Sequence, residues 1–129
     1  MILACTGSRE FNDEGVVDLI LARTDDLFTI RRIQVGDARG LDSLVVVWAA
    51  DHGVPFLREV CHWPKGPSTR QERWMAAHER NQRVIRGADL VLGFYARLEP
   101  SPGTQDALSI ARAEGIPGFV YQGGVWRPL

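Results

Sequence analysis

The chain has 129 residues, of which 45% are hydrophobic and 24% charged, and its formal net charge at pH 7 is −1. This length is typical of one domain, so we expect a single domain over residues 1–129 that buries enough surface to fold without disulfides. The composition argues against intrinsic disorder, and the near-neutral charge disfavours a nucleic acid or a membrane as the partner.

The first half of the chain predicts two strand–helix units. An apolar run indicates a strand at residues 1–5, and Asn12 or Asp13 is suited to cap a helix that runs to about Thr24. A second strand is expected at residues 30–35. After it, apolar residues recur at the spacing of an amphipathic helix that Gly53 ends: Leu41, Leu44, Val45 and Trp48.

The second half predicts two more such units and a short tail. Strands are expected at residues 54–60, 88–95 and 118–121, with a long loop at residues 62–69 and another at 96–103. Helices are expected from about Arg70 to Arg86 and from Thr104 to Glu114. Residues 123–124 are both glycine, which indicates a hairpin turn into a short tail strand around residues 125–126.

This alternation predicts the fold class. The strands are nearly continuously apolar, which is typical of strands covered on both faces. Right-handed crossovers between them give an α/β, Rossmann-like, doubly wound fold. We expect a mainly parallel five-stranded sheet with helices on both faces and a short C-terminal tail strand.

Cysteine usage and apolar run lengths indicate the cellular setting. Cys5 and Cys61 lie at or beside apolar runs without a CxxC spacing, which indicates buried thiols and neither a disulfide framework nor a zinc site. The first apolar run is too short for a signal peptide, and no run approaches the roughly 20 apolar residues of a membrane helix. We therefore expect a cytoplasmic protein that has no metal or cofactor.

Ligands of doubly wound folds bind beyond the carboxyl ends of the strands, so the loops that follow the strands hold the candidate residues. In the first such loop, Gly7 allows a tight turn and Ser8 offers a hydroxyl to a phosphate or ribose. Arg9 is suited to clamp an anion, and Phe11 to stack on a base. The alternative is a plain turn that carries a surface arginine.

The second glycine-containing loop covers residues 36–42. Gly36 and Gly40 let the backbone approach a ligand, and the helix that follows offers free N–H groups to an anion. Asp37 lies between them, and Arg39 is expected to share the binding of the anion. Asp42 either binds the ligand or favourably occupies the first turn of the helix, and the sequence leaves both roles open.

The third loop and the third helix complete the candidate site. Thr104 is a natural N-cap, and the amides around Gly103 and Thr104 are suited to a phosphate. Asp106 either binds a ribose or lies in the first helical turn without contacting a ligand. A helical stripe that also includes Trp74, Ala77 and Val84 places Asn81 on the inward face, where its amide needs partners. Arg80 beside it either faces the ligand or is exposed.

Several common motifs are absent from the sequence. It has no HxxxH or HExxH spacing for a helix-borne metal, and no GxSxG around a nucleophilic serine. It also lacks the P-loop pattern and the GxGxxG of ordinary dinucleotide-binding dehydrogenases. These absences disfavour zinc hydrolases, serine hydrolases, P-loop NTPases and NAD-dependent dehydrogenases.

The candidate motifs in their order resemble the YspA-like (cpYpsA-related) branch of the SLOG superfamily, and the match covers nearly the whole chain. This family is similar to the Lonely Guy phosphoribohydrolases and to DprA, with a Rossmann-like fold. The resemblance implies a nucleotide-derived ligand, a role in bacterial stress or conflict systems or in phages, and is compatible with a homodimer. The matching segments are residues 6–9 with Phe11 and Asp13, residues 36–40 with Asp42, residues 80–81, residues 87–89, and residues 103–104 with Asp106.

A comparison with Lonely Guy enzymes extends the resemblance to single positions. Their helical Met-His-x-Arg-Lys segment is similar to residues 78–81, so Arg80 lies where their catalytic arginine does, and Asn81 replaces their lysine. Of their Pro-Gly-Gly-x-Gly-Thr-x-x-Glu motif, Gly103 and Thr104 match. The final glutamate is replaced by Ala107, and Asp106 lies one residue earlier. The resemblance thus implies Arg80 and Asp106 as catalytic candidates.

Two functions are favoured by these residues, ahead of a DprA-like nucleic-acid role or a scaffold. In the first, the chain is a sensor or ligand-binding module for a nucleoside phosphate, ADP-ribose or an NAD-like molecule, with Arg80 as counter-charge. In the second, it is an N-glycosidase of the phosphoribohydrolase type, acting on a nucleoside monophosphate or dinucleotide. Asp106 or Asp42 then stabilises an oxocarbenium-like ribose or activates water, and Arg80 holds the phosphate or helps the base to leave.

Overall fold

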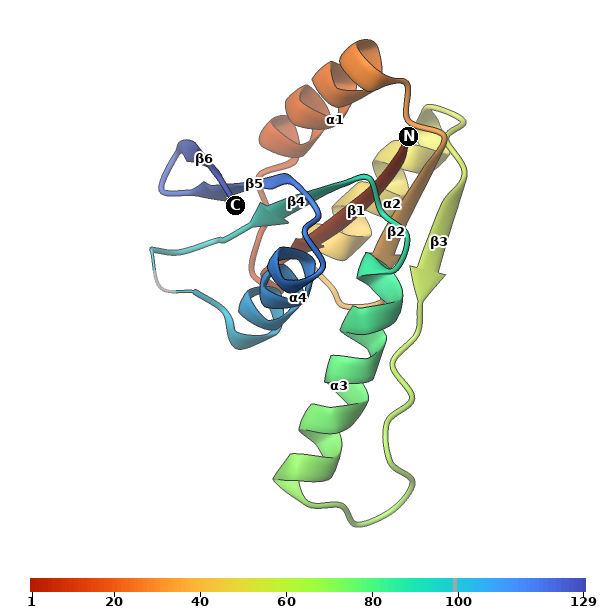
Figure 1. The fold of residues 1–129 in the computed structure, drawn as a ribbon, viewed down its shortest axis with the longest axis vertical. Coiled ribbons are helices and arrows are strands. Elements are labelled where there is room, and N and C mark those ends of the chain that lie inside the picture. The colour runs from red at the N-terminus through yellow and green to blue at the C-terminus, as the bar shows by residue number, and fades with distance from the viewer. Residues whose placement is uncertain (99) are drawn as a thin grey trace.

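Helices and strands alternate along the chain in the computed structural model, which describes residues 1–98 and 100–129 (Figure 1). The strands are β1 (Ile2–Gly7), β2 (Arg32–Gly36), β3 (Phe56–Glu59), β4 (Leu90–Phe94), β5 (Gly118–Gln122) and β6 (Val125–Pro128). The helices are α1 (Glu14–Phe28), α2 (Leu41–Asp51), α3 (Arg70–Ile85) and α4 (Pro102–Ala113). Each element expected from the sequence is present. Residue 99, within the loop expected at 96–103, lies outside the described residues.

The strands form one mostly parallel sheet in the order β3-β2-β1-β4-β5-β6. This confirms the expected α/β class and is consistent with a Rossmann-like fold. The sheet has six strands and not five, because the tail strand β6 pairs antiparallel with β5, with Tyr121 opposite Trp126. Gly123 and Gly124 form the connecting turn with φ angles of 61° and 79°, a backbone conformation that favours glycine.

Side-chain caps explain where two of the helices begin. Asp13, and not Asn12, caps α1, because its carboxylate accepts a hydrogen bond from the Val16 amide. Thr69 and Glu72 form a reciprocal capping box at the start of α3. The expected cap at Thr104 is wrong: Ser101 is the N-cap residue of α4, and Pro102 takes the first helical position, where its fixed φ suits a helix. The helix therefore begins two residues earlier than expected.

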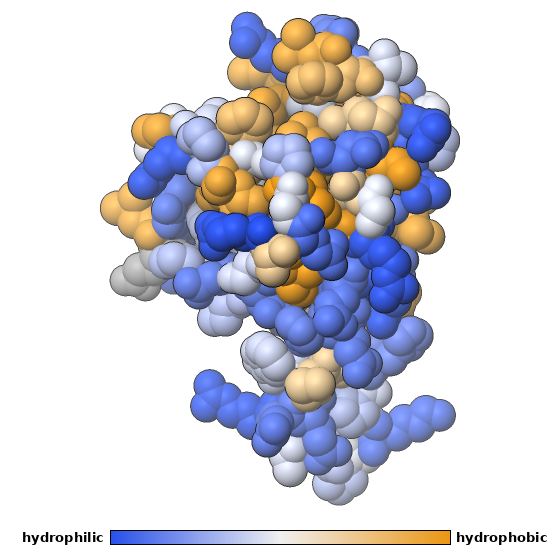
Figure 2. All heavy atoms as spheres, in the orientation of Figure 1, coloured by the Kyte–Doolittle hydropathy of each residue, from blue (hydrophilic) through white to orange (hydrophobic). Residues whose placement is uncertain are grey.

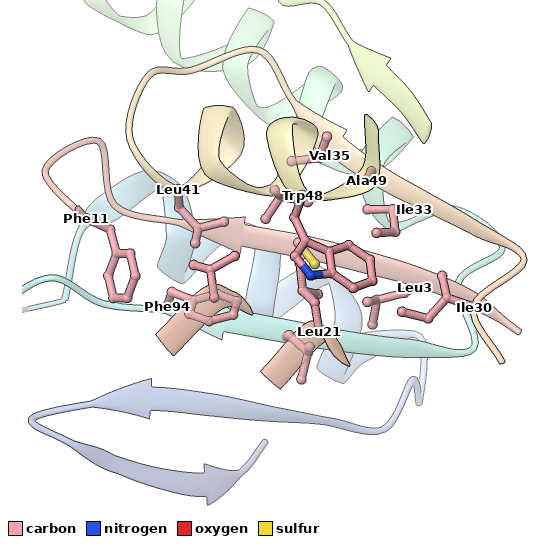
Figure 3. Close-up of a cluster of buried hydrophobic side chains, with 14 residues drawn as sticks. Leu3, Phe11, Leu21, Ile30, Ile33, Val35, Leu41, Trp48, Ala49 and Phe94 are labelled. Atoms are coloured by element: carbon pink, nitrogen blue, oxygen red, sulfur yellow. The ribbon is translucent and has the colours of Figure 1, made fainter. Parts of the chain in front are cut away.

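Buried apolar side chains form two clusters that use alternate residues of β1. The larger includes Leu3 and Cys5 with side chains of α1, α2 and β4, among them Trp48 of α2 (Figure 3). The smaller joins Ala4 to side chains of α3 and α4: Val84, Ile85, Ala107, Leu108 and Ala111. Consecutive residues of a strand point to opposite sides, so β1 contributes to both clusters.

The topology places β1 between β2 and β4, so the connections that leave the carboxyl ends of β1 and β4 diverge. This is the arrangement in which open α/β sheets form a binding crevice. The N-terminal part of α3 extends well beyond the sheet (Figure 1). Within residues 1–98 and 100–129, no helix is long and apolar enough to cross a membrane.

Candidate functional site

A pocket with a volume of about 370 Å³ lies beyond the carboxyl ends of β1 and β2, bordered by α3 and by the start of α4. This volume is within the range of small-molecule sites. The pocket brings together most of the residues predicted from the sequence, from all three glycine-containing loops and from the third helix. These residues are Gly7, Arg9, Gly36, Asp42, Arg80, Asn81, Gly103, Thr104 and Asp106.

The first loop contributes less to the pocket than the sequence predicted. Gly7 and the exposed Arg9 line the pocket, but Ser8 and Phe11 do not. The Ser8 hydroxyl is buried, accepts a hydrogen bond from the Ala96 amide at 3.2 Å, and so joins β1 to the loop after β4. Phe11 is 4% exposed and packs edge-on against Phe94 in the core (Figure 3), so it is not free to stack on a base.

The second loop contributes Gly36 and Asp42 to the pocket, whereas Asp37, Arg39 and Gly40 lie outside it. Gly36 borders two charged groups closely: a Cβ atom there would lie 2.8 Å from Oδ2 of Asp42 and 2.9 Å from Nη1 of Arg80. Arg39 is exposed to solvent.

Gly40 lets the second loop pack against the first. It has a φ of 78°, and a side chain there would overlap the backbone of residues 8 and 9. The Leu41 amide, the first of α2, donates to the Ser8 carbonyl at 3.3 Å. The two loops therefore form one continuous wall of the pocket.

Asp42 is the buried acid of this wall. Only 6% of the residue is exposed, and its Oδ2 atom accepts a hydrogen bond from the Ala38 amide at 3.0 Å. Burial raises the pKa of Asp42 to about 6, although that hydrogen bond and the nearby charges of Arg80 and Arg58 act in the opposite direction. The carboxyl group thus combines the first-turn position expected from the sequence with a place in the pocket.

Arg80 and Asn81 form the centre of a polar network on α3. Both residues are buried, and Nε of Arg80 donates to Oδ1 of Asn81 at 3.0 Å. Nη1 of Arg80 donates to Oδ1 of Asp37 at 2.6 Å, which excludes the alternative of an exposed arginine. Asn81 in turn donates to the Gly103 carbonyl and to Oδ2 of Asp106. The amide thus finds the partners its burial requires and holds the start of α4 against α3.

Asp106 lies beyond the first turn of α4, so it is not the helix-terminal acid that the sequence left open. Its carboxylate is 2.9 Å from Nδ1 of His78, through either oxygen, and also accepts the amide hydrogen of Asn81. The ring of His78 stacks on that of Trp74, with centroids 4.9 Å apart and planes 10° apart. Both rings line the pocket.

The start of α4 opens onto the pocket through residues Ser101 to Thr104. The N-cap residue makes no side-chain cap: the Ser101 hydroxyl donates to the hydroxyl of Thr104 at 2.8 Å and does not accept from the backbone. A Cβ atom on Gly103 would meet no atom within 4 Å, so there is open space beside this helix end. Pro102 has no N–H, so the first free amides of α4 are those of Gly103 and Thr104, and both residues line the pocket.

Sequence reasoning missed several residues of the site. Thr6, Glu10 and Ser101 line the pocket, and the guanidinium of Arg58 in β3 donates to the carbonyls of Gly36 and Ala38, which fixes the second loop. The helical stripe predicts that Trp74 faces inward but gives it no role, and the sequence does not pair His78 with Asp106. The spacing of Trp74 and His78, four residues apart on a helix, was the available signal that their rings meet.

Comparison with known proteins gives no relative. No protein-family model, curated protein or solved structure matches the chain. Among residues 1–98 and 100–129, no group of three or more histidine, cysteine, aspartate or glutamate side chains is placed to hold a metal ion.

Proposed function

We propose that this chain is a binding or sensor module for a nucleotide-derived ligand, such as a nucleoside phosphate, ADP-ribose or an NAD-like molecule. The observation that carries the proposal is the start of α4, where the N-cap residue Ser101 makes no side-chain cap and open space lies beside Gly103 in the pocket lining. Free amides at a helix N-terminus attract anions, and phosphate is the anion that such ends commonly bind. The order of the motifs, which resembles the SLOG superfamily, favours the same ligand class.

Two arginine side chains add full positive charges for a phosphate to the partial charge of the helix end. Arg9 lies exposed at the pocket, and the buried guanidinium of Arg80 faces it. Within the described part of the chain, Nε and Nη1 of Arg80 are engaged by Asn81 and Asp37, and no partner is present for Nη2. Nη2 is therefore available to a phosphate oxygen.

Carboxylates in the same pocket fit the sugar of a nucleotide. Asp42 and Asp106 both line it, and each is held by hydrogen bonds from the protein. A carboxylate accepts hydrogen bonds from hydroxyl groups, as acidic residues of Rossmann folds do from ribose. The start of α4 can bind an anion, and the carboxylates of Asp42 and Asp106 can accept hydrogen bonds from hydroxyl groups. Together they suit a ribose phosphate better than a simple anion.

Thermal unfolding with a ligand panel tests the proposal. The panel contains AMP, the deoxynucleoside monophosphates, ADP-ribose, NAD and cyclic nucleotides, and chromatography of each ligand follows. A ligand present at 100 times its dissociation constant adds about 2.7 kcal/mol of stability, which is several degrees for a domain of this size. Recovery of the ligand unchanged supports the sensor function, and the absence of any shift contradicts the proposal.

A substitution at Gly103 tests where the phosphate binds. Gly103→Asp places a carboxylate at the second position of α4, where it favours the helix but repels an anionic ligand. We expect this variant to keep its fold and to lose the ligand-induced shift. Gly103→Ala is the matched control, because the space beside Gly103 accommodates a methyl group. Equal shifts in both variants would place the phosphate elsewhere.

The second candidate function is hydrolysis of an N-glycosidic bond, favoured by the position of Asp106 in the pocket together with Arg80. Water would add its oxygen to the anomeric carbon of the ribose, and the bond to the base would break with transfer of a proton to the base. Asp106 would stabilise the oxocarbenium-like ribose or activate the water, and Arg80 would hold the phosphate or help the base to leave. Free base in the chromatograms supports this function. Asp106→Asn is then expected to abolish release while ligand binding remains.

A further inference from the structure

Trp74 is an aromatic side chain in the pocket that takes no part in the proposed phosphate contacts at α4 or in the proposed ribose contacts of Asp42 and Asp106. It lies in the second turn of α3, lines the pocket, and is 51% exposed. A large apolar ring that is half exposed at the wall of a polar pocket has apolar surface available to a ligand.

His78 fixes the indole ring from one side. The imidazole stacks on the indole, and its Nδ1 atom is held by the Asp106 carboxylate, which is itself held by Asn81. The imidazole cannot rotate without breaking these contacts, and the indole cannot turn in that direction without losing the stack. One face of Trp74 is therefore covered and its position is set before any ligand binds, which lowers the entropy cost of binding.

No other aromatic ring among the described residues of the pocket lining is available for stacking. Among the described residues that line the pocket, Trp74 and His78 are the only ones with aromatic side chains, and His78 already covers Trp74 with one face. Phe11, the residue expected to stack on a base, lies in the core against Phe94 and Tyr121. The open face of Trp74 is thus the one large aromatic surface that this lining offers.

The distance between Trp74 and the start of α4, where the phosphate is proposed to bind, indicates how long a ligand must be to reach both. Asn81, which contacts the Gly103 carbonyl, follows Trp74 by seven residues of α3, or about 10 Å along the helix axis. The part of α3 that carries Trp74 projects beyond the sheet, and the molecular surface there is mainly hydrophilic in the view of Figure 2. A ligand with an anionic group at α4 therefore needs a spacer, such as a sugar, to bring a ring to Trp74.

We propose that the open face of Trp74 is a stacking site for the planar heterocycle of the ligand, with His78 and Asp106 as the residues that position it. This inference rests on the proposed function, since it assigns the base-binding end of the same pocket. Stacking on an aromatic side chain depends little on the identity of the base, because every base has a π-face. The site is thus expected to accept purines and pyrimidines, with purines bound more tightly owing to their larger area.

Calorimetric titration with AMP, CMP, ribose 5-phosphate and adenosine tests this inference. We expect the two nucleotides to bind about 5- to 150-fold more tightly than ribose 5-phosphate, the range that stacking of one base supplies. Trp74→Ala should reduce both nucleotides to the affinity of ribose 5-phosphate and leave ribose 5-phosphate itself unchanged. Trp74→Phe, which keeps a ring, should retain part of the difference and lose the quenching of indole fluorescence by AMP.

Trp63→Ala is the matched control, because Trp63 is similarly exposed, at 49%, but does not line the pocket. It should bind all four probes as the wild-type chain does. Equal affinity of AMP and ribose 5-phosphate, or a difference that survives in Trp74→Ala, would overturn the stacking site and leave the phosphate site intact. Binding of adenosine that Trp74→Ala abolishes, without binding of ribose 5-phosphate, would instead uphold the stacking site and remove the phosphate site. Failure of all four probes to bind would remove both.

Discussion

Nη1 of Arg80 lies 2.6 Å from Oδ1 of Asp37, and this contact joins α3 to the loop that follows β2. The second oxygen of Asp37 accepts a hydrogen bond from the Cys61 amide, so the same carboxylate also holds the segment after β3. One aspartate outside the pocket thereby connects three segments and sets the position of the guanidinium inside it.

A double-mutant cycle measures this contact. Asp37→Asn and Arg80→Gln should each lower the free energy of unfolding by about 1–3 kcal/mol, because each leaves a partly buried partner uncompensated. The double variant should lose less than the sum, with a coupling of about 0.5–3 kcal/mol in urea denaturation. Strictly additive losses would mean that the pair does not contribute as a unit.

The pH dependence of stability should report on Asp42. Burial raises its pKa from 3.8 to about 6, so the folded state binds the proton more tightly than the unfolded state. Protonation of Asp42 therefore stabilises the folded state. This stabilisation is complete below about pH 4 and is lost as the pH rises through 6. Asp42→Asn should therefore be more stable than the wild-type chain at pH 7.5, by about 1–3 kcal/mol, and this advantage should vanish near pH 4.

Denaturation in urea at pH 4, 6 and 7.5 checks this expectation, with Asp18→Asn on the exposed surface of α1 as the control. The control should differ little from the wild-type chain at any of these pH values. A loss of stability in Asp42→Asn at pH 7.5 would show that the charged carboxylate is favourable in the folded state.

Gly36→Ala should damage the pocket. The added Cβ atom would lie within 3 Å of both Asp42 and Arg80, so at least one of these side chains must move. We expect a loss of about 1–3 kcal/mol in unfolding free energy together with weaker binding of AMP. Gly15→Ala in α1 is the control, since its Cβ meets only ordinary contacts and alanine favours a helix by about 1 kcal/mol. Equal behaviour of the two variants would contradict the close packing at Gly36.

Ser8→Ala separates stability from binding. The hydroxyl is the acceptor for the Ala96 amide, so its removal should lower the free energy of unfolding by about 1–3 kcal/mol. Ribose 5-phosphate affinity, measured by calorimetry at a temperature where the variant is folded, should not change. A tenfold loss of affinity without a loss of stability would return Ser8 to the ligand site.

Local sequence patterns were sufficient for the order of the elements and for much of the pocket. Apolar runs mark the strands, and Asp13 and Gly53 mark helix ends, because each of these signals acts within one or two turns of the chain. The glycine loops also indicated the correct edge of the sheet, since the carboxyl ends of parallel strands share one edge.

Apart from the local cap of α4, the errors described next concern contacts between distant segments. Ser8 and Ala96 are 88 residues apart, and His78 and Asp106 are 28 apart, so no local pattern records either pair. Phe11 looked like a free aromatic residue in a loop, yet it enters the core because Phe94 and Tyr121 lie beside that loop once β4 and β5 have joined the sheet. Packing against these two rings stabilises the buried position of Phe11, although its place in a loop suggested an exposed side chain.

The central place of β1 in the sheet makes the pocket a joint property of both halves of the chain. The lining joins Gly7, Gly36 and Asp42 of the first half to Arg80, Gly103 and Asp106 of the second, and β1 pairs with both β2 and β4. A ligand bound as proposed would contact both halves of the chain at once. Such a ligand would bind only a chain in which both halves are folded, so its binding energy would stabilise the two halves together.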